Sequence, residues 1–386
     1  MSLLRSVRFP AVVLLCAAVL GLIVANSPIG PAVEDLSHVY LGIPGIFEMS
    51  IDHWIADGLL AIFFFVVAVE LQYELTAGQL DSARKALRPA IAAAGGVLIP
   101  IAVFVLFAHG SEAANGWPIP TATDIAFALG VLAVFGTGLP SGVRIFLLAL
   151  AILDDIVGIV FIAVLFTSDV QLPLLLLALV LAGVFAYLSR QLGGRGHRLI
   201  VAALVVIAIA TWVAVYLSGV HATIAGVVLG LAMAQQPALR ARHALEPWVN
   251  AIVLPVFAFA AALVVIPAVS PSQLSPAFWG VLIALPIGKI VGISVLGWVA
   301  QRVVPGSGPR LAYGDLLAAG ALGGIGFTVS LLLSELAFAE TPLVRDEATL
   351  GVLGGSLISL VLAAMLVSWR AWHHRTAARA PQPTTT

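Results

Sequence analysis

The chain has 386 residues, of which 61% are hydrophobic and 10% charged, with a mean hydropathy of +1.11. Soluble domains hold roughly 45–50% apolar and about 25% charged residues, so this composition excludes a soluble globular protein. A net charge of −1 without a dense basic run argues against nucleic acid as a partner. The single cysteine, Cys16, and the absence of zinc-ligand spacing argue against a disulfide scaffold or a structural zinc site.

The first apolar run, from Phe9 to Val24, follows Arg5 and Arg8 and has the charge pattern of a secretory signal. Its cleavage would leave an odd number of spans and disturb the charge distribution described below. Leu14-Leu15-Cys16 lacks the small residue expected before a lipidated cysteine. We therefore interpret residues 10–26 as a membrane span.

Apolar runs of about 20 residues, the length needed to cross a membrane, recur along the whole chain. Clusters of Pro and Gly, together with charges, divide them into twelve candidates: 10–26, 57–75, 89–108, 119–135, 143–167, 171–190, 199–217, 219–234, 248–266, 277–301, 311–337 and 348–369. Irregular backbone cannot face lipid, so we predict an all-α polytopic protein with twelve transmembrane helices in a single domain, residues 1–376. The polar residues 377–386 predict a disordered cytoplasmic tail.

Positive charges lie almost entirely on one side of these spans. Only Arg345 falls on the other side, and Lys289 falls inside a span. The remaining sixteen occupy alternate connections: Arg5, Arg8, Arg84, Lys85, Arg88, Arg144, Arg190, Arg195, Arg198, Arg240, Arg242, Arg302, Arg310, Arg370, Arg375 and Arg379. The positive-inside rule then predicts that both termini are cytoplasmic and that the span count is even.

The longest outer connection, residues 26–54, has a pattern typical of a β-hairpin. Val39-Tyr40-Leu41 and Ile46-Phe47-Glu48-Met49 flank a turn signal from Gly42 to Gly45 that contains Pro44.

Ionisable residues within the spans are the feature that structure alone does not explain. Each costs about 2.5–3.5 kcal/mol at a helix centre, so four central ones cost on the order of 10 kcal/mol unless they are paired or hydrated. They are Asp57, Glu70, Asp124, Asp154, Asp155 and Lys289.

Asp154 and Asp155 lie together near the middle of one span. Consecutive helical residues point about 100° apart, so one carboxylate can face a protein partner while the other faces a water-filled cavity. Their mutual repulsion favours a site that exchanges a proton for a cation, although a neutral hydrogen-bonded pair is an alternative. Lys289 is too deep to reach either interface easily, so we expect it to pair with Asp154 or Asp155.

Two spans carry signals of a break. Asp124 follows Pro118-Ile119-Pro120 and is either a simple N-cap or a charge that compensates a half-helix N-terminus in mid-membrane. In the eleventh span, Gly320, Gly323, Gly324 and Gly326 indicate either close helix packing or a discontinuous helix. One break in each half is typical of a secondary transporter with inverted repeats.

Other polar residues are weaker candidates. Asp57 and Glu74 can be explained by a solvated span end, and Glu70 lies between them. His221 occupies a tight connection, where capping or packing is common, but its charge changes near neutral pH.

Several segments together resemble the bacterial NhaA family of Na+/H+ antiporters, nearly end to end. The segments are Thr121 to Gly130, Leu150 to Asp155, Asp57 to Phe64, Ser218 to Gly226, Gly288-Lys289 and Gly324 to Thr328. The resemblance implies a homodimer of twelve-span protomers, joined through the hairpin, in the lipid of the bacterial inner membrane. It also implies two unwound helices that cross at the midplane.

The same resemblance implies roles for individual residues. Asp155 would bind the transported Na+ or Li+, Asp154 would be its neighbour paired with Lys289, Asp124 would face the half-helix N-termini, and Thr123 would supply oxygen nearby. Na+ would leave in electrogenic exchange for a larger number of protons, with a role in Na+ and pH homeostasis. No cofactor beyond these ions is expected.

The chain departs from the pattern expected of the family at two places. Gln72 and Tyr73 stand where basic residues are expected, so Glu70 and Glu74 would lack nearby cations and the pH response would be shallower. Ala261-Ala262-Leu263 stands where a polar segment is expected, which leaves one packing contact unexplained.

We therefore predict a transporter rather than an enzyme, with pH-response candidates Glu70, Glu74, His221 and Asp57. An intramembrane aspartyl protease would need aspartates on separate spans and a Gly-x-Gly-Asp motif, whereas Gly324-Ile325-Gly326 is followed by Phe327. A cation channel is the other alternative. The sequence does not determine ion preference, affinity, coupling ratio or resting conformation.

Overall fold

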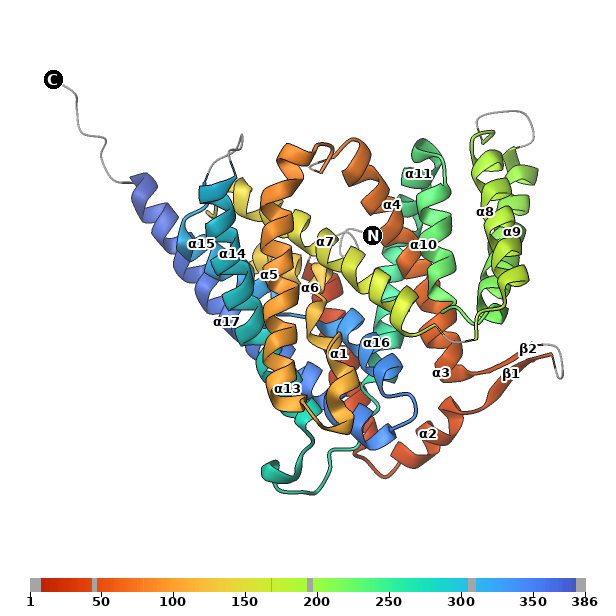
Figure 1. Ribbon diagram of the computed structural model, residues 1–386, viewed down its shortest axis with the longest axis horizontal. Helices are drawn as coiled ribbons and strands as arrows, with labels where there is room; N and C mark the ends of the chain where they lie inside the picture. Colours follow the sequence, from red (N-terminus) through yellow and green to blue (C-terminus); the bar gives the residue numbers. More distant parts are fainter. Residues whose placement is uncertain are drawn as a thin grey trace.

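The computed structural model describes residues 8–43, 47–78, 80–167, 169–192, 197–304 and 310–379. These residues form a helical bundle with one projecting β-hairpin (Figure 1). The α-helices are α1 (Arg8–Ala25), α2 (Gly30–Ser37), α3 (Ile51–His53), α4 (Leu60–Thr76), α5 (Ala83–Ala108), α6 (Ile125–Phe135), α7 (Ser141–Leu165), α8 (Leu172–Ser189), α9 (His197–Leu217), α10 (Thr223–Ala232), α11 (Gln235–Trp248), α12 (Leu254–Ala261), α13 (Pro276–Ile283), α14 (Lys289–Val303), α15 (Tyr313–Gly323), α16 (Phe327–Ala337) and α17 (Pro342–Arg379).

Short 3₁₀ and π segments join several of these helices. The 3₁₀ segments are η3 (Glu112–Gly116), η4 (Ile119–Thr121) and η6 (Pro271–Gln273), and the π segments are η2 (Trp54–Leu59), η5 (Val249–Val253) and η7 (Ala284–Gly288). Asp57 lies within η2, and Lys289 directly follows η7. A π segment interrupts the regular hydrogen bonds of an α-helix, and such segments are frequent at functional sites. Their position makes Asp57 and Lys289 candidates for a functional role.

The described residues contain eight helices long and apolar enough to cross a membrane, or up to eleven if each bent helix pair is one span. The chain is therefore a multi-pass membrane protein. Each of the twelve predicted regions contains helix, but α10 has only ten residues. At 1.5 Å per residue it is about 15 Å long, half of the roughly 30 Å hydrocarbon core, so its region does not qualify by itself.

The predicted hairpin is confirmed. β1 (Tyr40–Ile43) pairs antiparallel with β2 (Phe47–Ser50), and Tyr40 lies opposite Ser50. Residues 44–46, where the turn was predicted, lie outside the described residues. The hairpin extends away from the bundle (Figure 1).

The end of the chain differs from the prediction of a tail beginning at residue 377. α17 continues to Arg379, so residues 377–379 are helical, and residues 380–386 lie outside the described part. A helix of 38 residues is longer than the bilayer requires, which allows its last turns to project beyond it.

Close packing of α5 against α14 positions Lys289. A Cβ atom built on Gly95 or on Gly292 would collide with the backbone oxygen of the other, so only glycine allows the two backbones to approach this closely. α5 also contains Pro89 and Pro100, which cannot donate to the helix ladder. Gly288 packs against Pro100, so Lys289 begins α14 at a place where two irregular backbones meet.

Candidate ion-binding site

Two broken helices meet at the centre of the site. The segment Glu112–Thr121, which ends in η4, and α6 are bent by 48° around the extended residues 122–124, and α15 and α16 are bent by 49° around residues 324–326. The backbone N–H of Asp124 donates to the carbonyl of Ile325 at 2.6 Å. The glycine-rich segment from Gly323 to Gly326 therefore forms a true discontinuity rather than a packing face of a continuous helix.

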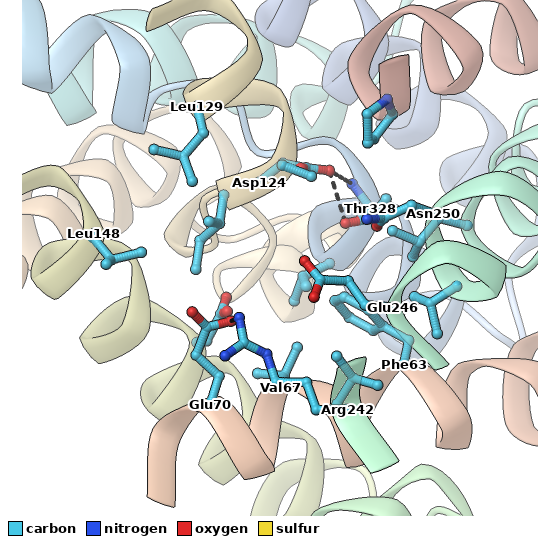
Figure 2. A pocket seen from close by; sticks show the side chains of 18 of the residues that line it. Phe63, Val67, Glu70, Asp124, Leu129, Leu148, Arg242, Glu246, Asn250 and Thr328 are labelled. Atoms are coloured by element: carbon cyan, nitrogen blue, oxygen red, sulfur yellow. Dashed lines mark hydrogen bonds and ion pairs between the residues drawn. The ribbon is translucent and has the colours of Figure 1, made fainter. Parts of the chain in front are cut away.

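Asp124 joins the N-termini of both half-helices. Its Oδ1 accepts from the backbone N–H of Phe127 at 3.0 Å, which caps α6. Its Oδ2 accepts from the Thr328 hydroxyl at 2.9 Å and from the Thr328 backbone N–H at 3.3 Å, in the first turn of α16 (Figure 2). The simple N-cap and the compensating charge predicted from the sequence are thus both present, because one buried carboxylate faces two positive helix ends.

Lys289 is completely buried and donates to three oxygen atoms. Its Nζ lies 2.6 Å from Asp154 Oδ2, 2.5 Å from the carbonyl of Thr121 and 3.1 Å from Thr123 Oγ1. These partners use all three N–H bonds of an ammonium group. Between the two aspartates that the sequence left open, Asp154 is the one that contacts Lys289.

Thr123 links the charge pair to the second break. Its hydroxyl lies 2.8 Å from Asp154 Oδ2 and 2.8 Å from the carbonyl of Gly323. A hydroxyl has one proton, so it donates to only one of these oxygens at a time. A change in the hydrogen bond between Thr123 and Asp154 would therefore also change the contact of Thr123 with Gly323, the last residue of α15.

Asp155 has different surroundings although it is the next residue of α7. It lines the main cavity, its side chain is buried, and its Oδ1 has no hydrogen-bond partner among the described residues. The Oδ1 atom of Asp154 is likewise buried without such a partner. The turn of about 100° between neighbours explains why one aspartate faces Lys289 and the other faces the cavity.

The cavity has a volume of about 570 Å³. Since one water occupies about 30 Å³ in the liquid, several waters can accompany a small cation inside. Its wall includes Thr123, Asp124 and Thr328 at the helix breaks, Asp155 of α7, and a polar group farther along α4, α7 and α11 (Figure 2). That group consists of Glu70, Arg144, Arg242, His243 and Glu246.

The cavity wall offers carboxylate and hydroxyl oxygens, which are suitable ligands for a hard cation. In the described ranges no group of three or more His, Cys, Asp or Glu side chains could hold a metal ion. Carboxylate and backbone oxygens at unwound helices are the ligands that ion transporters use near the membrane midplane.

The expectation that Glu70 lacks a nearby cation is wrong. Arg242 Nη2 lies 3.0 Å from Glu70 Oε2, because α11 packs against α4 and brings a distant part of the sequence to it. Gln72 instead donates to the carbonyls of Leu231 and Met233 at 2.7 and 2.8 Å. Gln72, which stands where the resemblance predicts a basic residue, thus attaches the end of α10 to α4.

The remaining pH-response candidates lie apart from the cavity wall. Glu74 is buried at the end of α4. His221 Nδ1 lies 3.2 Å from Asp57 Oδ1, and Trp212 donates its indole N–H to the carbonyl of Asp57 at 3.0 Å. The structure therefore joins His221 and Asp57 into one pair that sequence spacing did not reveal.

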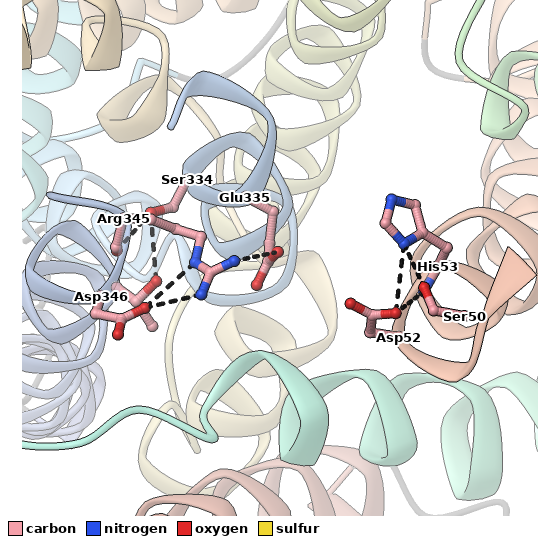
Figure 3. Close-up of polar contacts among 8 residues, drawn as sticks. Ser50, Asp52, His53, Ser334, Glu335, Arg345 and Asp346 are labelled. Atoms are coloured by element: carbon pink, nitrogen blue, oxygen red, sulfur yellow. Dashed lines mark hydrogen bonds and ion pairs between the residues drawn. The ribbon is translucent and has the colours of Figure 1, made fainter. Parts of the chain in front are cut away.

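Arg345, the cation predicted on the outer side, lies among carboxylates. Its guanidinium is 3.2 Å from Asp346 Oδ1 and 4.0 Å from Glu335 Oε2, and Asp52 and His53 lie across from this group (Figure 3). This pairing accounts for the only positive charge that the sequence assigned to that side.

The segment Ala261-Ala262-Leu263 finds its polar contact elsewhere. Asn26, at the end of α1, donates its side-chain amide to the carbonyl of Val264 at 3.0 Å and accepts from the backbone N–H of Ile266 at 2.9 Å. A single asparagine on a neighbouring helix thus binds the backbone just after α12.

Sequence reasoning left several residues of this site without a role. In the sequence Thr328 is recognisable only as part of the glycine-rich motif and Arg242 only as a positive charge, and no motif indicates Glu246 or His243. The available signal was a charged stretch, Arg240 to Glu246, directly before an apolar span. Nothing in the sequence spacing indicated that it faces Glu70.

Comparison with known proteins places this arrangement in a family. Residues 1–367 match the family described as Na+/H+ antiporter 1. The chain is 54% identical to "Na(+)/H(+) antiporter NhaA 2" of Clavibacter michiganensis, covering 98% of this chain and 94% of that protein. It is 47% identical to "Na(+)/H(+) antiporter NhaA" of Tropheryma whipplei, covering 95% of each, and 43% identical to its namesake from Mycolicibacterium smegmatis, covering 95% and 86%.

A solved structure shares the fold. The sodium proton antiporter NhaP1 of Methanocaldococcus jannaschii at pH 8 superposes with a TM-score of 0.58 at 17% identity, over 93% of this chain and 91% of that one. The family match over residues 1–367 includes the two helix breaks, Asp154, Asp155 and Lys289. The chain therefore belongs to the NhaA family of Na+/H+ antiporters.

Proposed function

We propose that the chain exports Na+, and also Li+, in electrogenic exchange for a larger number of incoming protons, with both ions competing at Asp155. One observation carries the proposal: Asp155, a buried carboxylate with an oxygen that has no hydrogen-bond partner among the described residues, lines a cavity of about 570 Å³, and its neighbour Asp154 forms an ion pair with Lys289. Such a carboxylate can hold a cation or a proton, but not both at full strength.

The neighbouring pair gives the exchange its coupling. A cation bound at Asp155 would lie close to Asp154 and compete with Lys289 for the negative charge of Asp154. A proton on Asp155 would remove this competition. Thr123 and Lys289 both contact Asp154 Oδ2, so any change in this carboxylate reaches both helix breaks. Asp124 supplies the negative charge that balances the two half-helix N-termini.

We further propose twelve spans with inverted repeats, both termini in the cytoplasm and a bacterial inner-membrane location. The charge bias of the connections supports the orientation. Arg144 and Arg242, both assigned to the cytoplasmic side, line the cavity, which supports an inward-facing conformation. Alternating access then requires the crossed helices to expose Asp155 to the other side.

A homodimer is proposed through the hairpin. Tyr40, Leu41 and Ile43 on β1 are 69%, 50% and 61% exposed, which leaves an apolar edge strand in the projecting hairpin. Exposed apolar edges are typical of strands that pair with a second chain.

Inside-out vesicles with a pH-sensitive dye test the exchange. An imposed proton gradient should dissipate only when Na+ or Li+ is added to vesicles that contain the chain. Conductance of Na+ without proton movement would instead identify a channel, and no response to either ion would contradict the proposal.

A further inference from the structure

The N-terminus of α16 needs hydrogen-bond partners from other elements, because the first N–H groups of a helix have none within it. Asp124 accepts from the Thr328 N–H, as described above. The Phe327 N–H donates to Ser356 Oγ at 3.3 Å, from the middle of α17. One end of the break is thus capped by a charged side chain from α6 and a neutral one from α17.

A second hydroxyl of α17 lies at the other end of the break. Ser359 is fully buried and its Oγ has no hydrogen-bond partner among the described residues. A Cβ atom built on Gly324 would lie 2.6 Å from Ser359 Oγ and 2.7 Å from the carbonyl oxygen of Leu285, so the hydroxyl rests directly against the unwound backbone. A buried polar group without a partner is costly and calls for an explanation.

The two serines share one face of α17 because they are three residues apart. The same face carries Gly355, which packs against Leu282 and Leu285 of α13 and η7. α17 therefore presents hydroxyls to residues 324–327 from a continuous helix, whereas the partner on the opposite side of the break, Asp124, lines the ion cavity.

We propose that Ser356 and Ser359 are positioning residues of ion exchange. Ser356 caps α16 in the arrangement seen here, and Ser359 binds the backbone of residues 324–326 when the break rearranges. Two side chains, Asp124 and Ser356, cap the N-terminus of α16. A cation in the cavity competes with Thr328 for the carboxylate of Asp124, and this weakens the cap that Asp124 provides. The inference rests on the exchange function proposed above.

The two serines should then respond in opposite ways. Ser359→Ala removes a hydroxyl that is unpaired in the resting arrangement, so the thermal midpoint in detergent should be unchanged or higher. Its maximal exchange rate should fall about fivefold, the effect of one net hydrogen bond, with the apparent KM for Na+ unchanged. Ser356→Ala should lower the thermal midpoint, and Ser356→Thr, which keeps the hydroxyl, should restore it relative to Ser356→Ala.

Ser294→Ala is the matched control, because Ser294 is also a buried membrane serine but bonds only to its own helix, at Val291. It should leave the exchange rate unchanged. A Ser359→Ala protein with a rate within about twofold of wild type, or with a slower rate that follows a lower thermal midpoint, would overturn the inference. A wild type without Na+-dependent proton movement would overturn the proposed exchange itself, which distinguishes the two failures.

Discussion

Asp154 and Asp155 are adjacent in sequence, yet tertiary contacts give them different tasks. Lys289 and Thr123 surround Asp154, whereas Asp155 faces a cavity. Burying a charge without a partner is far more costly than burying a pair, so Lys289 and Asp154 depend on each other. Among the described residues no cationic side chain forms an ion pair with Asp155, which is the basis for the role proposed for it.

Asp155→Asn should abolish cation-dependent proton movement while the protein still inserts. The asparagine amide is neutral, so it lacks the full negative charge that binds Na+, and it neither takes up nor releases a proton near neutral pH. The check is dye-monitored exchange in vesicles at matched protein abundance, with Asp169→Asn in the connection between α7 and α8 as the control. Near-normal exchange by the Asp155→Asn protein would rule out this assignment.

Lys289→Ala should reduce stability as well as exchange, because it leaves Asp154 buried without its cation. Breaking a buried pair costs about 3–5 kcal/mol. Lys289→Arg retains a charge but fits the three oxygens differently, so it should lose less stability and keep more activity. Thermal unfolding in detergent is the measurement, and equal midpoints for wild type and Lys289→Ala would show that the pair does not stabilise the fold.

At the scale of elements, interrupted helices create the site and continuous helices support it. The breaks at 122–124 and 324–326 free backbone groups that would otherwise be used inside a helix, and Asp124, Ser330 and Ser356 bind across them. Such irregular backbone is tolerated at membrane depth only where protein or water surrounds it. α5, α14 and α17 provide that surrounding.

The hairpin should determine the oligomeric state without affecting the ion site. Tyr40→Ser, Leu41→Ser and Ile43→Ser combined remove apolar surface that is already exposed, so the fold of the protomer should persist. We expect a shift from dimer to monomer in detergent, measured by light scattering, with exchange retained in vesicles. Val206→Ser, on the exposed face of α9, is the control. A triple variant that stays dimeric would exclude the hairpin as the contact.

At the scale of the whole molecule, the wall of the cavity extends from Asp155 to Arg144 and Arg242. Glu70 and Arg242 form an ion pair in its wall, and Glu246 and His243 lie near them. The earlier reason to expect a shallow pH response, a lack of cations around Glu70, therefore does not hold. We therefore expect the Glu70–Arg242 pair to shape the pH response.

Exchange should be inhibited at acid pH because protons compete with Na+ at Asp155. If one proton competes with one ion, a tenfold rise in Na+ should move the acid limb of the rate profile by about one pH unit towards acid without changing the maximal rate. Arg242→Gln should make the profile shallower while this Na+ dependence persists. The test is initial rate against pH at several Na+ concentrations.

Two outcomes would contradict this account of the pH response. A profile insensitive to Na+ would show that protons act away from Asp155. An unchanged slope in Arg242→Gln would place the pH response outside the Glu70 pair, and the His221 and Asp57 pair would be the next to examine.

The sequence alone determined the class of protein, the helical fold, the hairpin and the residues that carry charge into the membrane. It could do so because two free energies, that of exposing apolar surface to water and that of placing a charge in lipid, depend on composition and residue spacing. Both can be read from short stretches of the sequence. The glycines from Gly323 to Gly326 indicated either a break or close helix packing, and only the structure decided in favour of the break.

Only the tertiary structure decided which charges meet. Lys289 is 135 residues from Asp154 along the chain, Arg242 approaches Glu70 from another helix, and Ser356 reaches Phe327 across the break. Spacing within one helix fixes the direction of a side chain relative to its neighbours but not which other helix it will face. That choice depends on how helices pack, as the contact of Gly95 with Gly292 illustrates, and packing is a property of the whole chain.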